Sequence, residues 1–267
     1  MSTIQAIEQR RSVRSYTDIP LRQEDVERIE SYIAGLEAPF GRQAHIRLVR
    51  RDLPQGKVKL GTYGVIGGAQ DYLTLCCGNL PLDDESAGYV FEKLILFCTS
   101  IGLGTCWLGG SFSRKDFGGQ VEPEAGERIR AVSPVGYAND RKRLWDVLIG
   151  AERHHTSRKP FDSLFFHHDF LTPLTEKAAG IYYQPLEMVR RGPSANNFQP
   201  WRVVVDAPQV HFFHRKTLGG FDALDSGIAL AHFGETCREL ALAGHFEVRP
   251  DHPVAKDVVY SATWIAD

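Results

Sequence analysis

The order of the predicted elements constrains this chain most, because the same order occurs twice. In each half, a helix is followed by two strands, a long apolar helix and a last strand. The long helices carry apolar residues at spacings of three and four, which is the period of a buried helical face. The first copy comprises residues 22–36, 45–49, 72–77, 89–103 and 129–135, and the second comprises 186–190, 202–205, 210–213, 227–244 and 258–264.

This repeat predicts an α+β fold with two pseudo-symmetric α/β halves, because helices interleaved with strands pack in layers around a common core. Residue identity between the halves is low, so the repeat is one of structure. We place the boundary after residue 175, which makes 1–175 the first half and 176–267 the second. The two halves are expected to pack as a pseudo-dimer within one chain.

The charge balance gives no reason to expect a nucleic acid partner. The chain has 31 Lys and Arg residues against 33 Asp and Glu residues, for a formal net charge of -2, and such a chain has no general affinity for polyanions. Its first residues are polar and lack the apolar core of a secretory signal. No apolar run approaches the roughly 20 residues that span a bilayer. We therefore expect a cytoplasmic protein without a membrane partner.

The cysteines and histidines do not form a metal-binding pattern. The cysteines are odd in number, lie mostly at apolar positions and lack CxxC spacing, which is typical of reduced core thiols. The adjacent pairs His154-His155 and His167-His168 are interpreted as solvated. His211 and His214 are three apart on a predicted strand and so face opposite sides. We predict no metal site. The cysteines are Cys76, Cys77, Cys98, Cys106 and Cys237.

Two basic segments are candidate phosphate sites. The first contains Arg10, Arg11, Ser12 and Arg14 within five residues. Guanidinium groups offer forked donors that match phosphate oxygens. The alternative is the solvated basic end of a helix. The second segment is Arg158 with Lys159, directly before Pro160. These two cations could complete a phosphate site, or they could simply be solvated.

A polar loop of sequence GPSANNFQPW, residues 192–201, leads into a predicted strand. Its small and amide-bearing residues, Pro193, Ser194, Ala195 and Asn197, can present hydrogen-bonding groups to a ligand. An ordinary connecting loop is the alternative interpretation.

The segment IGLGTCWLGG, residues 101–110, is rich in glycine, and glycines such as Gly109 and Gly110 let the backbone approach a planar ligand closely. A dinucleotide-binding GxGxxG motif is excluded, because that motif needs a strand before it and a helix after it. This segment follows a helix and has Trp107 in place of the last glycine.

Together these four segments resemble the nitroreductase family of flavoproteins, over nearly the whole chain. In that family, an R-R-S-x-R segment holds the FMN phosphate and the pyrimidine side of the ring, and a P-S-x-x-N segment covers the flavin. A glycine-bearing loop meets the N5 edge, and a basic pair before proline returns to the phosphate. The resemblance implies FMN bound by Arg10, Arg11, Ser12, Arg14, Gly109, Gly110, Arg158, Pro193, Ser194, Ala195 and Asn197.

The chain departs from ordinary family members in the order of these segments. Those members are homodimers with a flavin at the subunit interface, and their P-S-x-x-N segment lies close to the R-R-S segment. Here residues 37–43 occupy that place in altered form, and the intact version stands at 193–197. The second half lacks the R-R-S-x-R and G-L-G-T-C-W segments. This resembles an internally duplicated subfamily, a fused dimer with one FMN per chain that could be a monomer in solution.

The resemblance implies an FMN-dependent oxidoreductase that passes electrons from NAD(P)H to a nitroaromatic, a quinone or a similar acceptor. No catalytic side chain is required, because the cofactor supplies the redox chemistry. The amides of Gly109 and Gly110 are expected at flavin N5, and Arg14 at the N1 and O2 edge. One alternative is a flavin-binding protein for storage or sensing without turnover. Another is a flavin-consuming or dehalogenating member of the same fold.

Overall fold

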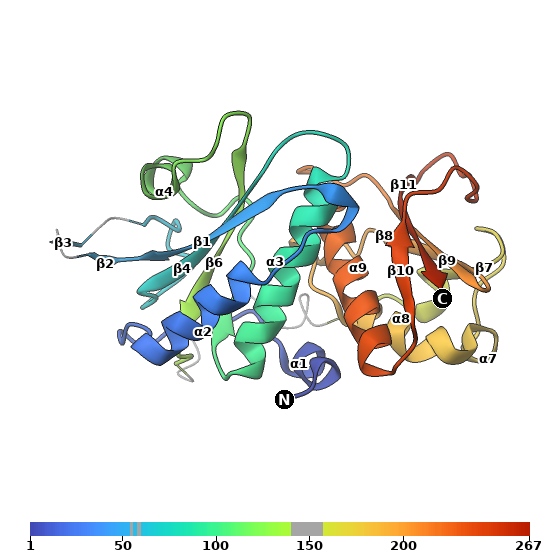
Figure 1. The fold of residues 1–267 in the computed structure, drawn as a ribbon, viewed down its shortest axis with the longest axis horizontal. Coiled ribbons are helices and arrows are strands. Elements are labelled where there is room, and N and C mark those ends of the chain that lie inside the picture. Colours follow the sequence, from blue (N-terminus) through green and yellow to red (C-terminus); the bar gives the residue numbers. More distant parts are fainter. Residues whose placement is uncertain (54–55, 58–59, 140–156) are drawn as a thin grey trace.

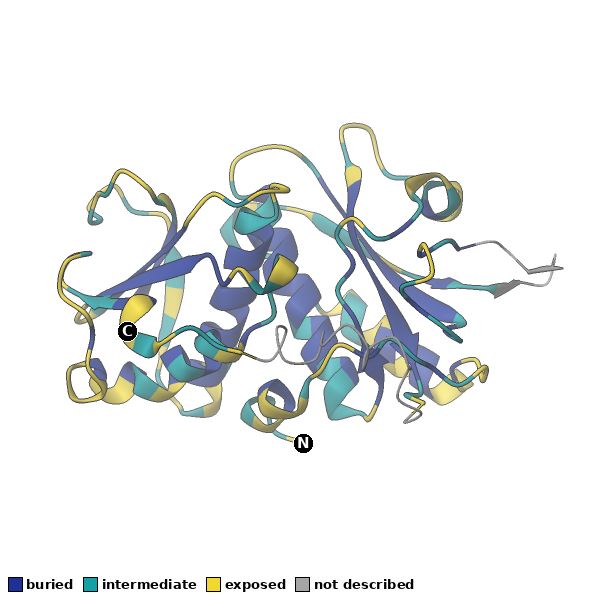
Figure 2. Cartoon of the chain, turned by 180° about the vertical axis from the view of Figure 1, so that it is seen from behind, coloured by how far each residue is buried: buried dark blue, intermediate teal, exposed yellow. Residues whose placement is uncertain are grey.

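Two long helices, α3 (Asp83–Ser100) and α9 (Asp222–Glu239), pack against each other at the centre of the molecule, with one β-sheet on either side (Figure 1). The computed structural model describes residues 1–53, 56–57, 60–139 and 157–267. Both helices are buried over most of their length, whereas exposed residues gather on the peripheral loops and short helices (Figure 2).

The two sheets have the same strand order. The first runs β1-β4-β6-β5, and the second runs β8-β9-β11-β10 with β7 added outside β8. All their pairings are antiparallel except that of β7 with β8. The predicted α+β fold with two pseudo-symmetric halves is therefore confirmed. The strands are β1 (Ala44–Arg50), β4 (Asp71–Cys77), β5 (Gly104–Thr105), β6 (Arg128–Gly136), β7 (Phe165–His167), β8 (Trp201–Asp206), β9 (Gln209–His214), β10 (Gly244–Glu247) and β11 (Val259–Ala266).

Shorter elements surround this framework. Strands β2 (Asp52–Leu53) and β3 (Gly56–Lys57) form a small separate ribbon. The α-helices are α1 (Thr3–Gln9), α2 (Gln23–Ala34), α4 (Arg114–Val121), α7 (Glu176–Ala179) and α8 (Tyr183–Arg191), and the 3-10 turns are η1 (Pro39–Gly41), η2 (Phe161–Ser163), η3 (Gly180–Tyr182) and η4 (Ala195–Asn197).

Each long helix contributes to the core of its own half. Phe91, Leu94 and Ile95 of α3 pack with Leu73 and Leu75 of β4, and α9 packs in the same way against β8, β9 and β11. The cysteines, interpreted from the sequence as reduced core thiols, are all buried and free.

The structure corrects the bounds of both predicted long helices. Helix α3 begins at Asp83, six residues before the predicted start at 89, because acidic side chains suit the first turn of a helix. Helix α9 ends at Glu239, and the predicted helical tail instead leads into β10, a strand that the apolar pattern did not indicate.

Both long helices end in the same way. The N–H of Leu103 donates to the carbonyl of Cys98, and the N–H of Leu242 donates to the carbonyl of Cys237, each over 2.9 Å. This is the Schellman cap, which needs a left-handed residue just before the last donor. Gly102 takes that position with φ 84° in the first half, and Ala241 takes it with φ 56° in the second.

The predicted boundary after residue 175 has a structural consequence. Strand β7 lies before that boundary yet pairs with β8 of the second sheet. If the boundary is right, the end of the first half extends across the molecule and completes the sheet of the second. The division into 1–175 and 176–267 remains a proposal.

Two glycines set the distance between α3 and α9. A Cβ atom added at Gly88 would lie 2.1 Å from the carbonyl oxygen of Leu224, and one added at Gly227 would lie 2.1 Å from that of Glu85. Each glycine stands five residues after the start of its helix. The helices therefore cross with their backbones in contact at two related points, a separation that only glycine permits.

We predict that Gly227→Ala destabilises the protein, because the new methyl group must push the two helices apart. Overpacking of this kind costs about 1–3 kcal/mol of the free energy of unfolding, which urea denaturation measures. Gly119→Ala is the matched control, since Gly119 is exposed on α4 with no atom within 4 Å of an added Cβ. It should gain about 0.5–1 kcal/mol from helix propensity. Equal stability of the two variants would contradict the close crossing.

Candidate active site

A cavity of about 420 Å³ lies where segments of both halves meet at the start of α9. Most of the residues predicted from the sequence to meet a ligand line it: Ser12 and Arg14 from the arm after α1, Gly109 and Gly110, and Pro193, Ser194 and Ala195. The remaining lining residues are Val65, Cys106, Trp107, Leu108, Ser111, Asn196, Leu218, Gly219, Phe221, Leu224, Asp225 and Ile228.

The arm is held against β5 by backbone contacts. The N–H of Val13 donates to the carbonyl of Thr105 over 2.8 Å, and Ser12 forms a parallel bridge to the same residue. A Cβ added at Gly104 would lie 2.9 Å from the Val13 side chain. Gly104 therefore lets the arm lie directly on the strand, which brings Ser12 and Arg14 to the cavity.

Four of the predicted residues lie outside the lining of this cavity: Arg10, Arg11, Arg158 and Asn197. Arg158 donates to the Asn197 side chain over 3.2 Å and to the carbonyl of Arg191 over 2.9 Å. Arg11 is exposed. Arg10 is close enough to Arg158 to affect its pKa. The structure thus gathers Arg10, Arg158 and Asn197 at a second position, beside the loop of residues 192–201 (the covering loop).

A cluster of positive charge forms there. The pKa of Arg158 is lowered to about 10, first by burial and then by the charges of Arg10, Arg190 and Arg191 in that order of effect. Arg10 Nε is buried and has no hydrogen-bond partner among the described residues. Guanidinium groups repel one another in a partly desolvated place, so a bound anion would relieve the repulsion here.

Sequence reasoning missed Arg190 and Arg191, which end helix α8. Arg190 pairs with Glu187 over 2.6 Å, and Arg191 lies 3.6 Å from the same carboxylate. The positive charges of both arginines therefore act on Arg158, although the carboxylate of Glu187 neutralises them in part. Their signal in the sequence was available, since two adjacent arginines directly precede Gly192 and the polar loop.

The loop that follows is held rigidly by its own side chains. Ser194 Oγ accepts the N–H of Gln199 over 2.9 Å, and the Gln199 side chain accepts the N–H of Lys159 over 2.8 Å. Asn196, Asn197 and Gln199 all have left-handed φ angles, between 46° and 56°. Asparagine adopts this region more readily than most residues, which accounts for the Asn-Asn pair. The loop therefore keeps one shape over the cavity.

Asp225 fastens this loop to helix α9, and no sequence motif had singled it out. Both of its carboxylate oxygens accept the N–H of Ala195, each over 3.1 Å. The side chain lines the cavity although only 3% of the residue is exposed. Burial raises the pKa of Asp225 well above its ordinary value, and the hydrogen bond from Ala195 opposes that shift only in part.

The glycine loop after β5 is anchored from two sides. A Cβ added at Gly109 would lie 2.7 Å from the Phe221 ring, whereas one at Gly110 would meet nothing within 4 Å. Trp107 Nε1 donates to Glu92 over 2.7 Å, and the same carboxylate pairs with His232 over 2.9 Å in the buried contact of α3 with α9. A glycine is therefore needed at position 109 by the packing of Phe221, independently of any ligand.

Arg130 connects the halves beside the cavity. It makes a bidentate hydrogen bond to Asp84 of α3, over 2.6 and 2.8 Å, and also donates to the carbonyl of Gly220. Its guanidinium lies 5.0 Å from the centre of the Phe221 ring. This strand residue of the first sheet thereby positions Phe221 of the second half against Gly109.

Two predicted absences can be compared with the described part of the chain. There, no group of three His, Cys, Asp or Glu side chains could hold a metal ion. His168 contacts Asp206, and His211 contacts Thr263, while His154 and His155 lie outside the described residues. Within the same described ranges, no helix has both the length and the apolar character to cross a membrane.

We predict a pH-dependent benefit from Asp225→Asn. A raised pKa means that the folded state holds this proton more tightly than the unfolded state does, so the ionised group costs stability once the pH exceeds about 4. Asparagine still accepts the Ala195 N–H but carries no charge. The stability of the variant relative to the original chain, from urea unfolding, should therefore rise between pH 4 and pH 8. A constant difference over that range would contradict a buried, costly carboxylate.

The fold and the cavity together define an α+β protein with a candidate ligand site built from segments of two pseudo-symmetric halves. Residues 2–236 match the family described as "Putative TM nitroreductase". The chain therefore belongs to this family.

One solved structure shares the fold over nearly the whole chain, and two others are similar to parts of it. A "putative nitroreductase" from Thermotoga maritima is 21% identical with a TM-score of 0.64, and the match covers 99% of this chain and 94% of that one. A nitroreductase family protein from Clostridium difficile is 18% identical, covering 60% and 94%, with a TM-score of 0.45. An FMN-dependent nitroreductase from Clostridium difficile is 17% identical, covering 52% and 88%, with a TM-score of 0.40. No curated protein matches the sequence.

Proposed function

We propose that this protein is an FMN-dependent oxidoreductase that transfers electrons from NAD(P)H to a nitroaromatic, a quinone or a similar acceptor. The observation that carries the proposal is the pairing of the arginine cluster around Arg158 with a cavity of about 420 Å³, joined by one rigid loop. FMN has the matching parts, namely a terminal phosphate and a flat ring system. Membership of a family described as nitroreductases supports the same chemistry.

The residues present fit the phosphate. Arg10 has a buried Nε atom with no partner among the described residues, and the pKa of Arg158 is lowered first by burial and then by its cationic neighbours. A bound phosphate dianion would relieve both conditions, because it supplies acceptors and neutralises the repulsion. Arg190 and Arg191 would add positive charge near the phosphate without having to contact it.

The cavity fits the ring. The amides of Gly109 and Gly110 donate no hydrogen bond to the described residues, so they are available to an acceptor atom such as flavin N5. Arg14 lines the same cavity from the arm, where its positive charge would stabilise negative charge at the N1 and O2 edge. Pro193, Ser194 and Ala195 form the cover.

The mechanism assigns binding and orientation to the protein. Bound FMN would supply the two-electron chemistry, accepting hydride from NAD(P)H and passing it to the acceptor. Arg14 stabilises negative charge, the Gly109 and Gly110 amides orient the reactive edge, and the loop fastened by Asp225 restricts water. This scheme requires no side chain as an acid or a base.

The site draws on both proposed halves. The arm, the glycine loop and Arg158 come from residues 1–175, and the covering loop comes from 176–267. We infer one FMN per chain at this site, because neither half supplies all of these groups. Since the pseudo-dimer is internal, the site needs no second copy of the chain.

We predict that Arg10→Ala and Arg14→Ala each weaken FMN binding about tenfold or more, because a hydrogen bond to a charged group contributes roughly 1.5–3 kcal/mol. Quenching of flavin fluorescence measures the dissociation constant. Arg11→Ala is the control, and its effect should be smaller because Arg11 is exposed and lies outside the cavity lining. Unchanged FMN affinity in both test variants would remove the phosphate assignment.

Turnover is the test of the catalytic part of the proposal. The FMN-loaded protein should oxidise NADH or NADPH only when a quinone or a nitroaromatic is present, with parallel double-reciprocal lines, since donor and acceptor would use the same face in turn. Intersecting lines would instead show a ternary complex. FMN binding without turnover would leave a flavin-binding protein for storage or sensing.

A further inference from the structure

A second cavity, of about 580 Å³, lies between η1, the end of α9 and strand β10. Four aromatic side chains line it together with several charged ones. Tyr89 and Phe246 meet edge to face at 6.3 Å between ring centres, and Phe246 meets Trp264 in the same way at 5.1 Å. Phe40 lines the cavity from the first half. None of these residues belongs to the cavity already described.

The second cavity occupies the pseudo-symmetric counterpart of the first. Residues 37–40 line it as residues 193–196 line the first. Both loops form a 3-10 turn with a left-handed central residue, Phe40 (φ 63°, ψ 20°) in one and Asn196 (φ 49°, ψ 22°) in the other. The loop at 37–40 is thus the structural equivalent of the covering loop.

The helices show the same correspondence. Tyr89 follows Gly88 and lines the second cavity, as Ile228 follows Gly227 and lines the first. Ser86 stands two residues before its glycine, in the position of Asp225, and donates to the carbonyl of Pro39 over 3.0 Å. The acceptor there is a carbonyl because proline has no N–H. Each long helix therefore holds its own covering loop.

The strands after the helices complete the comparison. Phe246 stands four residues beyond the Schellman donor Leu242, as Trp107 stands four beyond Leu103. Both aromatic residues line their cavity. Three separate elements thus match between the two sites, and the match does not depend on residue identity.

The charges of the two sites differ. Lys93 and Arg238 line the second cavity, but both contact one carboxylate, Glu235, over 3.1 and 2.5 Å. Glu37 adds an exposed negative charge at its edge. No counterpart of the arginine cluster is found among the described residues that line it. A phosphate would therefore gain little here.

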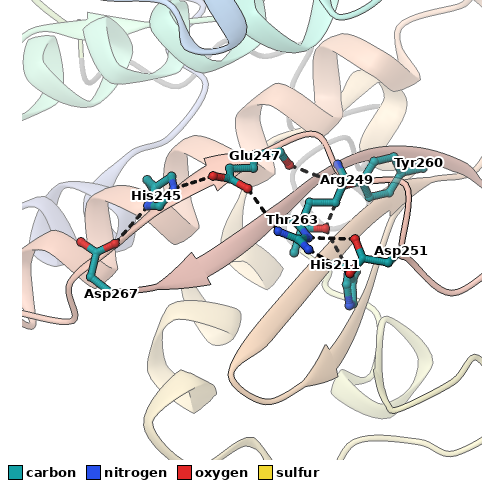
Figure 3. Close-up of polar contacts among 8 residues, drawn as sticks. All are labelled: His211, His245, Glu247, Arg249, Asp251, Tyr260, Thr263 and Asp267. Carbon is teal, nitrogen blue, oxygen red and sulfur yellow. Dashed lines mark hydrogen bonds and ion pairs between the residues drawn. The ribbon is translucent and has the colours of Figure 1, made fainter.

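His245 does not supply that charge either. Its ring lies between Glu247 and Asp267, with each contact at 3.0 Å (Figure 3). Hydrogen bonds to Glu247 and then to Asp267 raise the pKa of His245, so its protonated form is already matched by two carboxylates. The cation is thus neutralised within the protein.

We propose that this second cavity binds a planar, uncharged aromatic molecule that carries no phosphate. Rings favour edge-to-face and offset contacts with other rings, and the wall offers Phe40, Tyr89 and Phe246. The proposal does not depend on redox turnover at the first cavity.

Riboflavin is a suitable probe, because it has the flavin ring without the phosphate. The full chain is first saturated with FMN, and riboflavin binding is then measured by equilibrium dialysis with the excess FMN kept constant. We expect one further riboflavin per chain. Absence of riboflavin binding to the FMN-saturated protein would overturn the proposal, and so would a second FMN bound as tightly as riboflavin.

Two matched substitutions separate the sites. Ala38 and Ser194 occupy equivalent positions in the two loops. Ala38→Trp should fill the second cavity and weaken riboflavin binding at least tenfold while FMN still binds. Ser194→Trp should do the reverse. Riboflavin binding that survives Ala38→Trp, or that is lost with Ser194→Trp, would place riboflavin in the first cavity and refute the proposal.

A milder substitution guards against misfolding. Phe40→Asn places at the second loop the residue type found at Asn196, and asparagine suits the left-handed backbone there. It removes one ring from the wall, so riboflavin binding should weaken several-fold while FMN still binds. Because Phe40 also packs against a hydrophobic core cluster, the thermal midpoint should fall slightly. Unchanged riboflavin binding would show that the ring of Phe40 makes no contact and would contradict the proposal. Failure of FMN to bind would instead refute the proposed function, and the riboflavin result would still stand.

Discussion

The contact of α3 with α9 is the constraint on which the rest of the structure depends. Gly88 and Gly227 bring the two helix backbones together, and each helix carries its own sheet. The distance between the sheets, and hence the position of every loop at their edges, follows from this crossing. The buried pair of Glu92 and His232 lies in the same contact and also holds Trp107 at the cavity wall.

The arginine cluster around Arg158 and the first cavity are separate places that share the loop of residues 192–201. Asp225 holds the start of that loop through the N–H of Ala195, and Arg158 holds its end through Asn197. The lowered pKa of Arg158 and the raised pKa of Asp225 have the same first cause, which is burial of a charge. Both buried charges therefore cost stability in the folded protein.

Pseudo-symmetry explains why the chain has two cavities of similar construction and opposite character. The backbone of the covering loop is the same in both halves, whereas, among the described residues, the arginine cluster lies only beside the first cavity. Near the second, Glu235 neutralises Lys93 and Arg238. Backbone geometry is set by helix and sheet packing, so it persists while surface charges change.

The sequence by itself determined the element types, the repeat and seven of the residues that line the first cavity, because apolar periods, glycines and the Pro193–Trp201 motif are local signals. It misplaced the start of α3 and missed β10, since neither has a strong apolar pattern. Only the tertiary structure decided that Asp225 fastens the loop, that Arg190 and Arg191 join Arg158, and that residues 37–40 line a cavity of their own. These facts rest on contacts between residues far apart in the chain, and such contacts leave no mark on the pattern of neighbouring residues.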